Sequence, residues 1–272
     1  MPTTENLEKA PRKELHVFYV LDTSGSMTGA KIGALNHAME ESTIALKDVA
    51  RKNGDADLRI AVLEFNSGCK WVTSNGPEAM DDFEYEHLSC GGLTDIGAAL
   101  KELNSKLSRK SWLNSMVGAL MPVIIFMTDG FATDDYKGAL EEIKHNKWFT
   151  KGIRIGFAVG EEADADMIAE IVGNREAVIK TTDLELFSRL LKFVTVSAST
   201  LASSSQTTRS AFTGEDIVRD AKKTSGMETG NNNGPDFPGD TGGNNGGDDD
   251  DDDDDDDDGF PEDDDDDDEE GW

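Results

Sequence analysis

Short apolar runs alternate with longer segments of helical periodicity along the first two hundred residues of the chain. Residues 15–21 form an apolar run of strand length that ends at Asp22. A second run, residues 123–127, ends just before Thr128 and Asp129. Uninterrupted apolar runs of this length are typical of strands buried on both faces of a parallel sheet. Both runs therefore predict buried strands whose C-terminal ends lead into polar loops.

The segments between these runs predict helices. Apolar side chains recur at nearly helical spacing from Ile32 to Val49, and Asn53-Gly54 supplies a stop signal. Thr94 stands at the expected N-cap of a later helix, and Thr133-Asp134 at that of another. The other predicted elements are strands at 58–65, 70–73, 153–159 and 177–180, and helices at 96–107, near 134–147, near 164–172 and from about 183.

This alternation of strands and helices through short loops predicts an α/β fold. We expect a doubly wound, Rossmann-like arrangement with a mostly parallel central sheet and helices on both faces. The strands 58–65 and 70–73 are separated by Asn66-Ser67-Gly68, a hairpin-like turn, so the second is expected to be an antiparallel edge strand. In such folds ligands bind beyond the carboxyl ends of the strands.

The composition changes sharply after about residue 203, which divides the chain into four expected parts. Residues 1–13 form an N-terminal extension, and residues 14–203 form the one folded domain. Residues 204–247 are rich first in Ser and Thr and then in Gly, Asn and Pro, which is typical of a flexible linker. A charged stretch within them could form a helical turn or two. Residues 248–272 are expected to be a disordered acidic tail, because like charges repel and apolar surface is scarce there.

The formal net charge of −30 is concentrated in this tail. Residues 248–270 contain 20 acidic residues and no Lys or Arg, so the rest of the chain carries −10. No basic face is obvious in the sequence, which argues against direct binding of nucleic acid. The N-terminus has no apolar signal segment, and no stretch reaches 18 consecutive apolar residues. We therefore expect a soluble, cytoplasmic protein that does not bind membranes.

Five oxygen-bearing side chains follow the predicted strands at the edge where ligands bind. They are Asp22, Ser24, Ser26, Thr94 and Asp129. Carboxylates and hydroxyls without His or Cys suit a hard divalent cation, Mg²⁺ first, with Mn²⁺ or Ca²⁺ as alternatives. Two carboxylates offset the charge of the ion, and the neutral hydroxyls leave it able to attract one more anionic oxygen from outside the chain. The pattern therefore predicts a single metal site with an open position.

In these five positions the chain resembles the von Willebrand factor A (VWA) family, whose metal-ion-dependent adhesion site follows the pattern D-x-S-x-S, then T, then D. The resemblance implies that Ser24, Ser26 and Thr94 bind the metal directly or with the help of water. It implies that Asp22 and Asp129 often act through water. A Glu or Asp of a protein partner would complete the coordination shell. The family resemblance thus implies a protein-binding module that depends on a metal ion.

Over about residues 14–200 the chain is most similar to bacterial VWA proteins of the tellurite-resistance neighbourhood, the TerY type. The shared features are DTSGSM, TDG followed by TDD, and a C-terminal helix rich in Phe and Leu. Leu93, between the glycines and Thr94, departs from the Gly-Gly-Thr of many members. Such relatives are often encoded beside protein kinases and phosphatases. This implies a scaffold in stress or defence signalling whose partner could be a kinase or a phosphatase.

Enzymatic alternatives find little support in the sequence. It has no phosphate-binding loop, no dinucleotide-binding glycine pattern and no G-x-S-x-G elbow. No His or Lys adjoins the five ligand positions, and Lys31, one turn into the following helix, is expected to be solvated. We therefore expect no catalytic residues. Metal-dependent phosphoryl transfer remains an alternative, since it uses acidic oxygen ligands and Mg²⁺. A calcium-binding acidic protein that uses the fold only as a carrier is another.

The acidic tail has three possible roles. It could simply keep the protein soluble, or it could bind a cationic partner with Phe260 and Trp272 as aromatic anchors. It could also fill the open metal position of its own chain, because a linker of about 22 residues reaches on the order of 25 Å.

Overall fold

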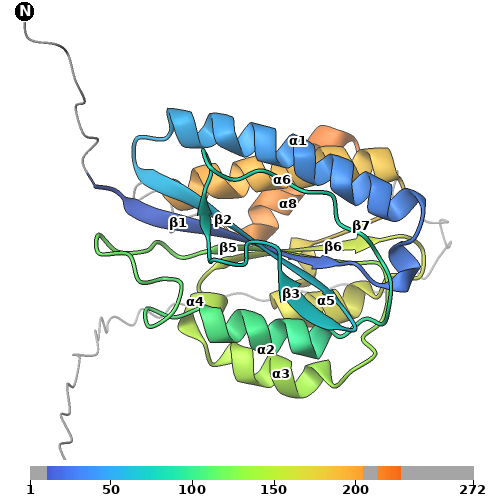
Figure 1. Cartoon of the computed structure of the whole chain (residues 1–272). Helices are drawn as coiled ribbons and strands as arrows, with labels where there is room; N and C mark the ends of the chain where they lie inside the picture. Colours follow the sequence, from blue (N-terminus) through green and yellow to red (C-terminus); the bar gives the residue numbers. More distant parts are fainter. Residues whose placement is uncertain (1–10, 205–212, 228–272) are drawn as a thin grey trace, which may run out of the picture. The chain divides into compact units, whose positions relative to one another are not determined.

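The computed structural model describes residues 11–204 and 213–227 of the chain. The predicted tail, with Phe260 and Trp272, lies outside these residues. Seven strands form one sheet in the order β3-β2-β1-β5-β6-β7, and β4 also pairs with β2 (Figure 1). The strands are β1 Lys13–Asp22, β2 Ala56–Asn66, β3 Gly68–Trp71, β4 Glu78–Ala79, β5 Val123–Thr128, β6 Ile153–Val159 and β7 Val178–Thr181.

The pairing confirms the predicted α/β architecture. Strands β2, β1, β5, β6 and β7 are parallel, whereas β3 and β4 run antiparallel to β2. The edge position of β3 follows from the tight turn at Ser67, which connects it to β2. The two-residue strand β4 was not expected from its sequence, because it is too short to show a period.

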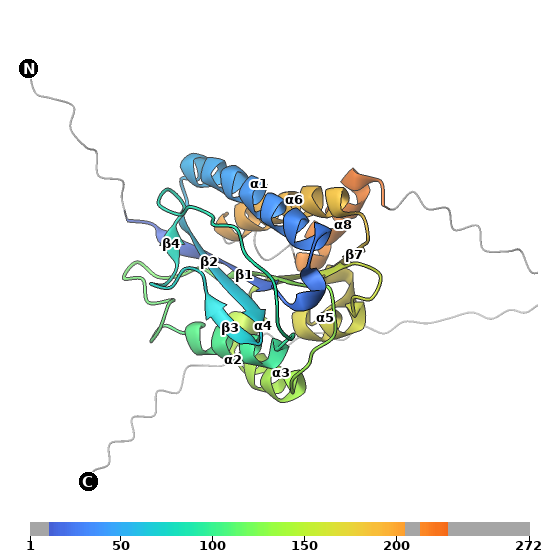
Figure 2. The same ribbon diagram turned by 45° about the vertical axis from the view of Figure 1, so that its right-hand side comes forward.

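Helices cover both faces of the sheet (Figures 1 and 2). The helices are α1 Ala30–Lys52, α2 Ile96–Lys106, α3 Tyr136–Lys144, α4 Lys147–Thr150, α5 Ala165–Val172, α6 Leu184–Ser203 and α8 Gly214–Ser225, with short 3₁₀ turns η1 Gly25–Met27 and η2 Arg175–Ala177. One layer contains α1, α6 and α8, and the other contains α2, α3, α4 and α5. No helix among the described residues has the length and apolar character needed to cross a membrane.

Strand β1 contributes to the packing on both sides of the sheet, because successive side chains of a strand point to opposite faces. Val17, Tyr19 and Leu21 belong to the cluster under α1 and α6. Phe18 and Val20 belong to the cluster under α2 and α3. All five side chains are fully buried, which explains why this segment reads as an unbroken apolar run.

The stretch after residue 212 is a complete helix and not only the turn or two that its sequence allows. Thr213 and Asp216 form a capping box at its start, and Gly226 takes the left-handed conformation at its end. Ile217 and Val218 are buried in the same cluster as residues of α6. Burial of this apolar stripe explains why α8 forms beyond residue 203.

The register of the central strands places the polar loops at one edge of the sheet. Asp22 pairs with Phe65 of β2, and Leu21 pairs with Met127 of β5. The chain therefore leaves β1 at Asp22 and β5 at Thr128 at the same level, because both strands run in the same direction. This edge carries the candidate metal centre.

Candidate metal centre

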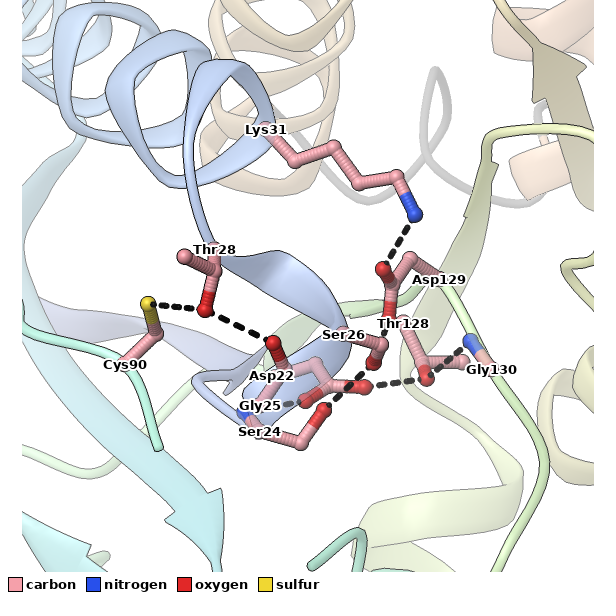
Figure 3. A network of polar contacts seen from close by, with 10 residues as sticks. All are labelled: Asp22, Ser24, Gly25, Ser26, Thr28, Lys31, Cys90, Thr128, Asp129 and Gly130. Carbon is pink, nitrogen blue, oxygen red and sulfur yellow. Dashed lines mark hydrogen bonds and ion pairs between the residues drawn. The ribbon is translucent and has the colours of Figure 1, made fainter. Parts of the chain in front are cut away.

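The Asp22 carboxylate is the most enclosed polar group of the site. One of its oxygens accepts a hydrogen bond from the Ser24 amide at 2.7 Å, and the other accepts one from the Thr128 hydroxyl at 2.5 Å (Figure 3). Burial raises the pKa of Asp22, and the nearby charge of Asp129 raises this pKa further. The hydrogen bonds from Ser24 and Thr128 act in the opposite direction and lower it. The site thus holds two buried carboxylates close enough to repel each other.

Two serine hydroxyls connect the first loop to the third. The hydroxyl oxygens of Ser24 and Ser26 lie 2.9 Å apart, and Ser26 donates to Asp129 Oδ1 at 2.6 Å (Figure 3). Ser24 is buried, whereas Ser26 lies in the exposed part of η1. Four of the five predicted ligands, Asp22, Ser24, Ser26 and Asp129, therefore come together directly in the folded chain.

The glycine loop that carries Thr94 packs against the first loop. The Gly25 amide donates to Gly92 O at 3.0 Å, and the Gly91 amide donates to Thr23 O at 2.8 Å. A Cβ on Gly25 would lie 3.3 Å from Gly92 O, so the close approach favours glycine there. Thr94 is 7% exposed, and within the described part of the chain its hydroxyl makes no hydrogen bond. A hydroxyl without a partner in the protein is free to act as a ligand.

The expected capping role of Thr94 is wrong, because α2 begins one residue later with Asp95 at the N-cap position. Asp95 instead accepts hydrogen bonds from the Gly68 amide at 2.7 Å and from the Thr133 hydroxyl at 3.0 Å. Thr133 also accepts from the Thr94 amide at 2.9 Å. The Thr94 backbone is therefore held by the loop of Thr133, while the side chain of the next residue, Asp95, binds the loop of Gly68.

Thr133-Asp134 was expected to cap the helix that follows it, and this expectation is also wrong. Asp135 occupies the N-cap of α3, while the two Asp134 oxygens accept from the amides of Gly97 and Ala98, each at 2.9 Å. Asp134 thus caps α2, a helix 36 residues earlier in the chain. A Cβ on Gly97 would lie 2.7 Å from Asp135 O, so glycine permits this contact.

Replacing Asp134 with alanine is expected to lower the free energy of unfolding by about 1–2 kcal/mol, because the first amides of α2 lose their acceptor. Asp82→Ala is the matched control, since Asp82 is exposed and its side chain makes no hydrogen bond or ion pair with the described residues. Urea unfolding of both variants measures the difference. Equal losses in the two variants would contradict the capping role of Asp134.

Lys31 lies in a different environment from the one that its sequence predicts. It was expected to be solvated, but its Nζ donates to Asp129 Oδ2 at 2.6 Å, and its side chain is only 31% exposed (Figure 3). A Cβ on Gly160 would lie 3.3 Å from Lys31 Cε, so this glycine leaves room for the lysine chain. A lysine therefore does adjoin a predicted ligand. Only the tertiary structure reveals it, because 98 residues separate the two partners.

The residues at this edge fit a hard divalent cation. Their donor atoms are all oxygens, from two buried carboxylates and three hydroxyls. Across residues 11–204 and 213–227, no three His, Cys, Asp or Glu side chains come together as a metal-binding group. A cation here would therefore depend on Ser24, Ser26 and Thr94 as well as on the two aspartates, as the sequence pattern predicts.

Comparison with known proteins identifies the fold. No family model matches the sequence. Proximal thread matrix protein 1 from the mussel byssus is similar in structure over 70% of this chain, with a TM-score of 0.52 and 17% identity. A von Willebrand factor type A protein from Catenulispora acidiphila is similar over 69%, with a TM-score of 0.51 and 17% identity. The matches cover 49% and 43% of those two chains. At this identity the likeness establishes the fold alone, which is that of a von Willebrand factor A domain.

Proposed function

We propose that this chain is a metal-dependent protein-binding module. Asp22, Ser24, Ser26, Thr94 and Asp129 would hold one divalent cation, and a Glu or Asp of a protein partner would supply a further oxygen. The observation that carries the proposal is the hydrogen-bonded series from Ser24 through Ser26 to Asp129, which gathers ligand-type oxygens from two separate loops. We also propose that the chain is similar to TerY-type proteins and that its metal-binding pattern is intact.

When bound, the cation supplies a positive charge that attracts an anionic oxygen, and Mg²⁺ is the ion proposed first. One part of the site is buried in the protein, and the other part is exposed to solvent. Asp22 and Ser24 are buried, whereas Ser26 and the neighbouring Thr28 are exposed. A partner carboxylate could therefore approach from the side of η1. A site open on one side suits recognition of a protruding acidic side chain.

Binding without catalysis remains part of the proposal. Lys31 is the one Lys or His side chain that contacts these five positions among the described residues, and it is engaged by Asp129. Metal-dependent phosphoryl transfer is the alternative, and turnover of a generic phosphate ester that depends on Asp22 would support it. A calcium-binding acidic protein is the second alternative, and many weak calcium sites located in the acidic tail would favour it.

A scaffold in a bacterial stress-response or defence system is the proposed setting, with a kinase or phosphatase as partner. The support is the resemblance of the sequence to TerY-type proteins. The test measures binding of the full chain to candidate kinases and phosphatases, with Mg²⁺ and with EDTA. We expect binding only with Mg²⁺, and loss of binding after substitution of one partner Asp or Glu. Binding that persists in EDTA would contradict the metal-dependent module.

Lys31 is expected to weaken metal binding, because its ammonium group repels a cation and competes for Asp129 Oδ2. Lys31→Met should therefore raise the affinity for Mg²⁺ about tenfold, or about 1.4 kcal/mol. Lys137→Met is the control, since Lys137 is exposed and makes no ion pair with any described residue. Calorimetric titration measures both variants. Unchanged affinity in Lys31→Met would contradict this repulsion, and weaker affinity would show that the lysine supports the site.

A further inference from the structure

Residues 103–128 and 143–160 are two of several stretches of the chain that have no acidic residue, although the whole chain has 56 acidic and only 26 basic residues. Residues 103–128 contain three Lys or Arg, and residues 143–160 contain four. In an acidic protein these stretches are local sources of positive charge. Because the two stretches are separated in sequence, the sequence alone does not show that they lie together.

The fold brings the two stretches together beyond the end of α2. Asn146, which precedes α4, donates to Asn104 Oδ1 at 2.9 Å and to Leu107 O at 3.0 Å. Leu107 and Phe149 are buried in the same cluster. Figure 1 shows α4 close to α2 on the lower layer of the molecule. The turn after α2 and the helix α4 therefore form one surface.

Four cations define this surface, which we call the basic corner. They are Arg109, Lys110, Lys147 and Lys151. All four side chains are exposed, and none makes an ion pair or hydrogen bond with another described side chain. The turn that carries the first two is compact, since the Leu113 amide donates to Ser108 O at 3.0 Å. One helical turn separates the other two, so both lie on the same side of α4.

The acidic side chains nearest in sequence do not neutralise the basic corner. Glu102 pairs with Lys106, at 3.2 Å, and Glu141 pairs with Lys144, at 2.7 Å, so both carboxylates balance a lysine outside the corner. Glu142 and Glu215, which lines a cleft with Lys151, form no ion pair with any described residue. The four cations of the corner have no ion-pair partner among the described residues, and the formal net charge of the chain is −30. Cations left in this way favour an anionic occupant.

We propose that the basic corner binds the acidic segment 248–270 of the same chain. This segment has 20 carboxylates in 23 residues, so several can pair with the four cations in many alternative arrangements. Such contact needs no fixed backbone conformation, because the attraction between opposite charges depends little on direction. The segment is also present at high effective concentration, since it is covalently joined to the domain.

The length of the chain allows this contact. Lys151 lines the same cleft as Thr213 and Gly214, so the start of α8 lies beside the basic corner. The twelve residues of α8 span about 18 Å. From its end, residues 226–247 provide a linker of about 22 residues with a typical reach on the order of 25 Å. The acidic segment can thus return to the side of the molecule from which α8 begins.

Binding at the basic corner would keep the acidic segment away from the metal centre. The corner lies where β6 begins, because α4 ends three residues before Ile153. The metal centre lies where the parallel strands β1 and β5 end, at the opposite edge of the sheet. The six residues of β5 alone span about 20 Å. Docking at the corner would therefore leave the metal centre accessible to a partner.

Carbodiimide cross-linking of the full chain tests this proposal. The reagent activates a carboxylate, which then forms an amide with a lysine amine, while the carbodiimide takes up the lost water and becomes a urea. The reaction is run in EDTA, so its result does not depend on metal binding and is separate from the proposed function. Mass spectrometry locates the lysines joined to residues 248–270. We expect Lys110, Lys147 and Lys151 to dominate at low salt and to lose most of their cross-links at about 1 M salt, where charges are screened beyond about 3 Å.

A charge-matched pair of variants provides the control. The corner variant replaces Arg109, Lys110, Lys147 and Lys151 with glutamine. The control variant replaces Lys13, Lys52, Lys137 and Lys223, which are exposed and lack ion pairs with described residues. The corner variant lacks three of the lysines that can be cross-linked, so cross-linking cannot be used to compare the variants. Instead, the rate of amide hydrogen exchange in residues 107–113 and 147–151 is compared between them. At low salt the parent and the control variant should show slower exchange there than at high salt, by at least about fivefold, and the corner variant should show no such difference.

Three results would overturn the proposal. Cross-links spread evenly over all exposed lysines would show that the tail has no preferred place. Salt-dependent protection that survives in the corner variant would show that these four cations do not hold it. In an equal mixture of ¹⁴N and ¹⁵N protein, equal numbers of mixed and unmixed cross-links would show binding between two chains, contrary to binding within one.

Discussion

Asp22→Ala is expected to weaken Mg²⁺ binding by at least about a hundredfold, on the order of 3 kcal/mol. The substitution removes one of two buried carboxylates that offset the charge of the ion. It also removes the acceptor for the Ser24 amide and the Thr128 hydroxyl, so the loop that carries both serines loses its support. Calorimetric titration of a chain ending at residue 247 measures the effect without the acidic tail while keeping α8 in place.

Two further variants separate loss of the metal site from loss of folding. Asp22→Asn keeps the shape and one acceptor oxygen but removes the charge, and it should lose most of the same affinity. Asp220→Ala removes an exposed carboxylate far along the chain, on α8, and should leave the affinity unchanged. All three should unfold cooperatively. Retention of tight, single-site Mg²⁺ binding by folded Asp22→Ala would eliminate this edge of the sheet as the metal centre.

The protein is expected to lose about 3 kcal/mol of stability through His16 alone as the pH falls from about 6.5 to about 4. His16 lies in β1 and is 1% exposed, and neither ring nitrogen has a hydrogen-bond partner. Burial lowers the pKa of His16 to about 4, and the positive charge of Arg59 lowers it as well. Glu14 lies 3.5 Å from its Nε2, but Arg59 engages the same carboxylate at 2.8 Å.

The direction of this effect follows from proton binding. Between pH 6.5 and 4 His16 is protonated in the unfolded chain but not in the folded chain. The free energy of unfolding therefore falls as the pH falls. His16→Phe removes the titrating group and should flatten this part of the pH profile, whatever its stability at pH 7. His145→Phe is the control, because His145 is exposed. Chemical unfolding at several pH values measures the slopes, and equal slopes for the parent and His16→Phe would contradict the prediction.

The strands and most helices could be predicted because their cause is local. The alternation of side chains along β1 and the 3.6-residue period of α1 leave a direct pattern in the sequence. Asp183 and Asp164 cap the helices that follow them through their own neighbouring amides, and the helices near 164 and 183 were accordingly placed correctly. The strand β4 has only two residues and owes its place to pairing with β2, so no local signal marks it.

The candidate ligands were also accessible from the sequence, for a topological reason. Parallel strands end at one edge of a sheet, so Asp22 and Asp129 had to converge once their strands were recognised. The partners of these ligands were not accessible in the same way. Asp134 was assigned to the helix beside it, yet it caps α2, because packing of α3 against α2 brings its carboxylate to another helix.

The sequence by itself determined the order of the longer strands and helices, the choice of five candidate oxygen ligands and the acidic character of residues 248–270, since each depends on neighbouring residues or on composition. Only the tertiary structure decided that Lys31 pairs with Asp129 and that the turn after α2 joins α4 in a basic corner. Those contacts join groups tens of residues apart, and their energies depend on distance through space. The separation of two residues in sequence does not predict their distance in space, which is set by the packing of the helices on the sheet.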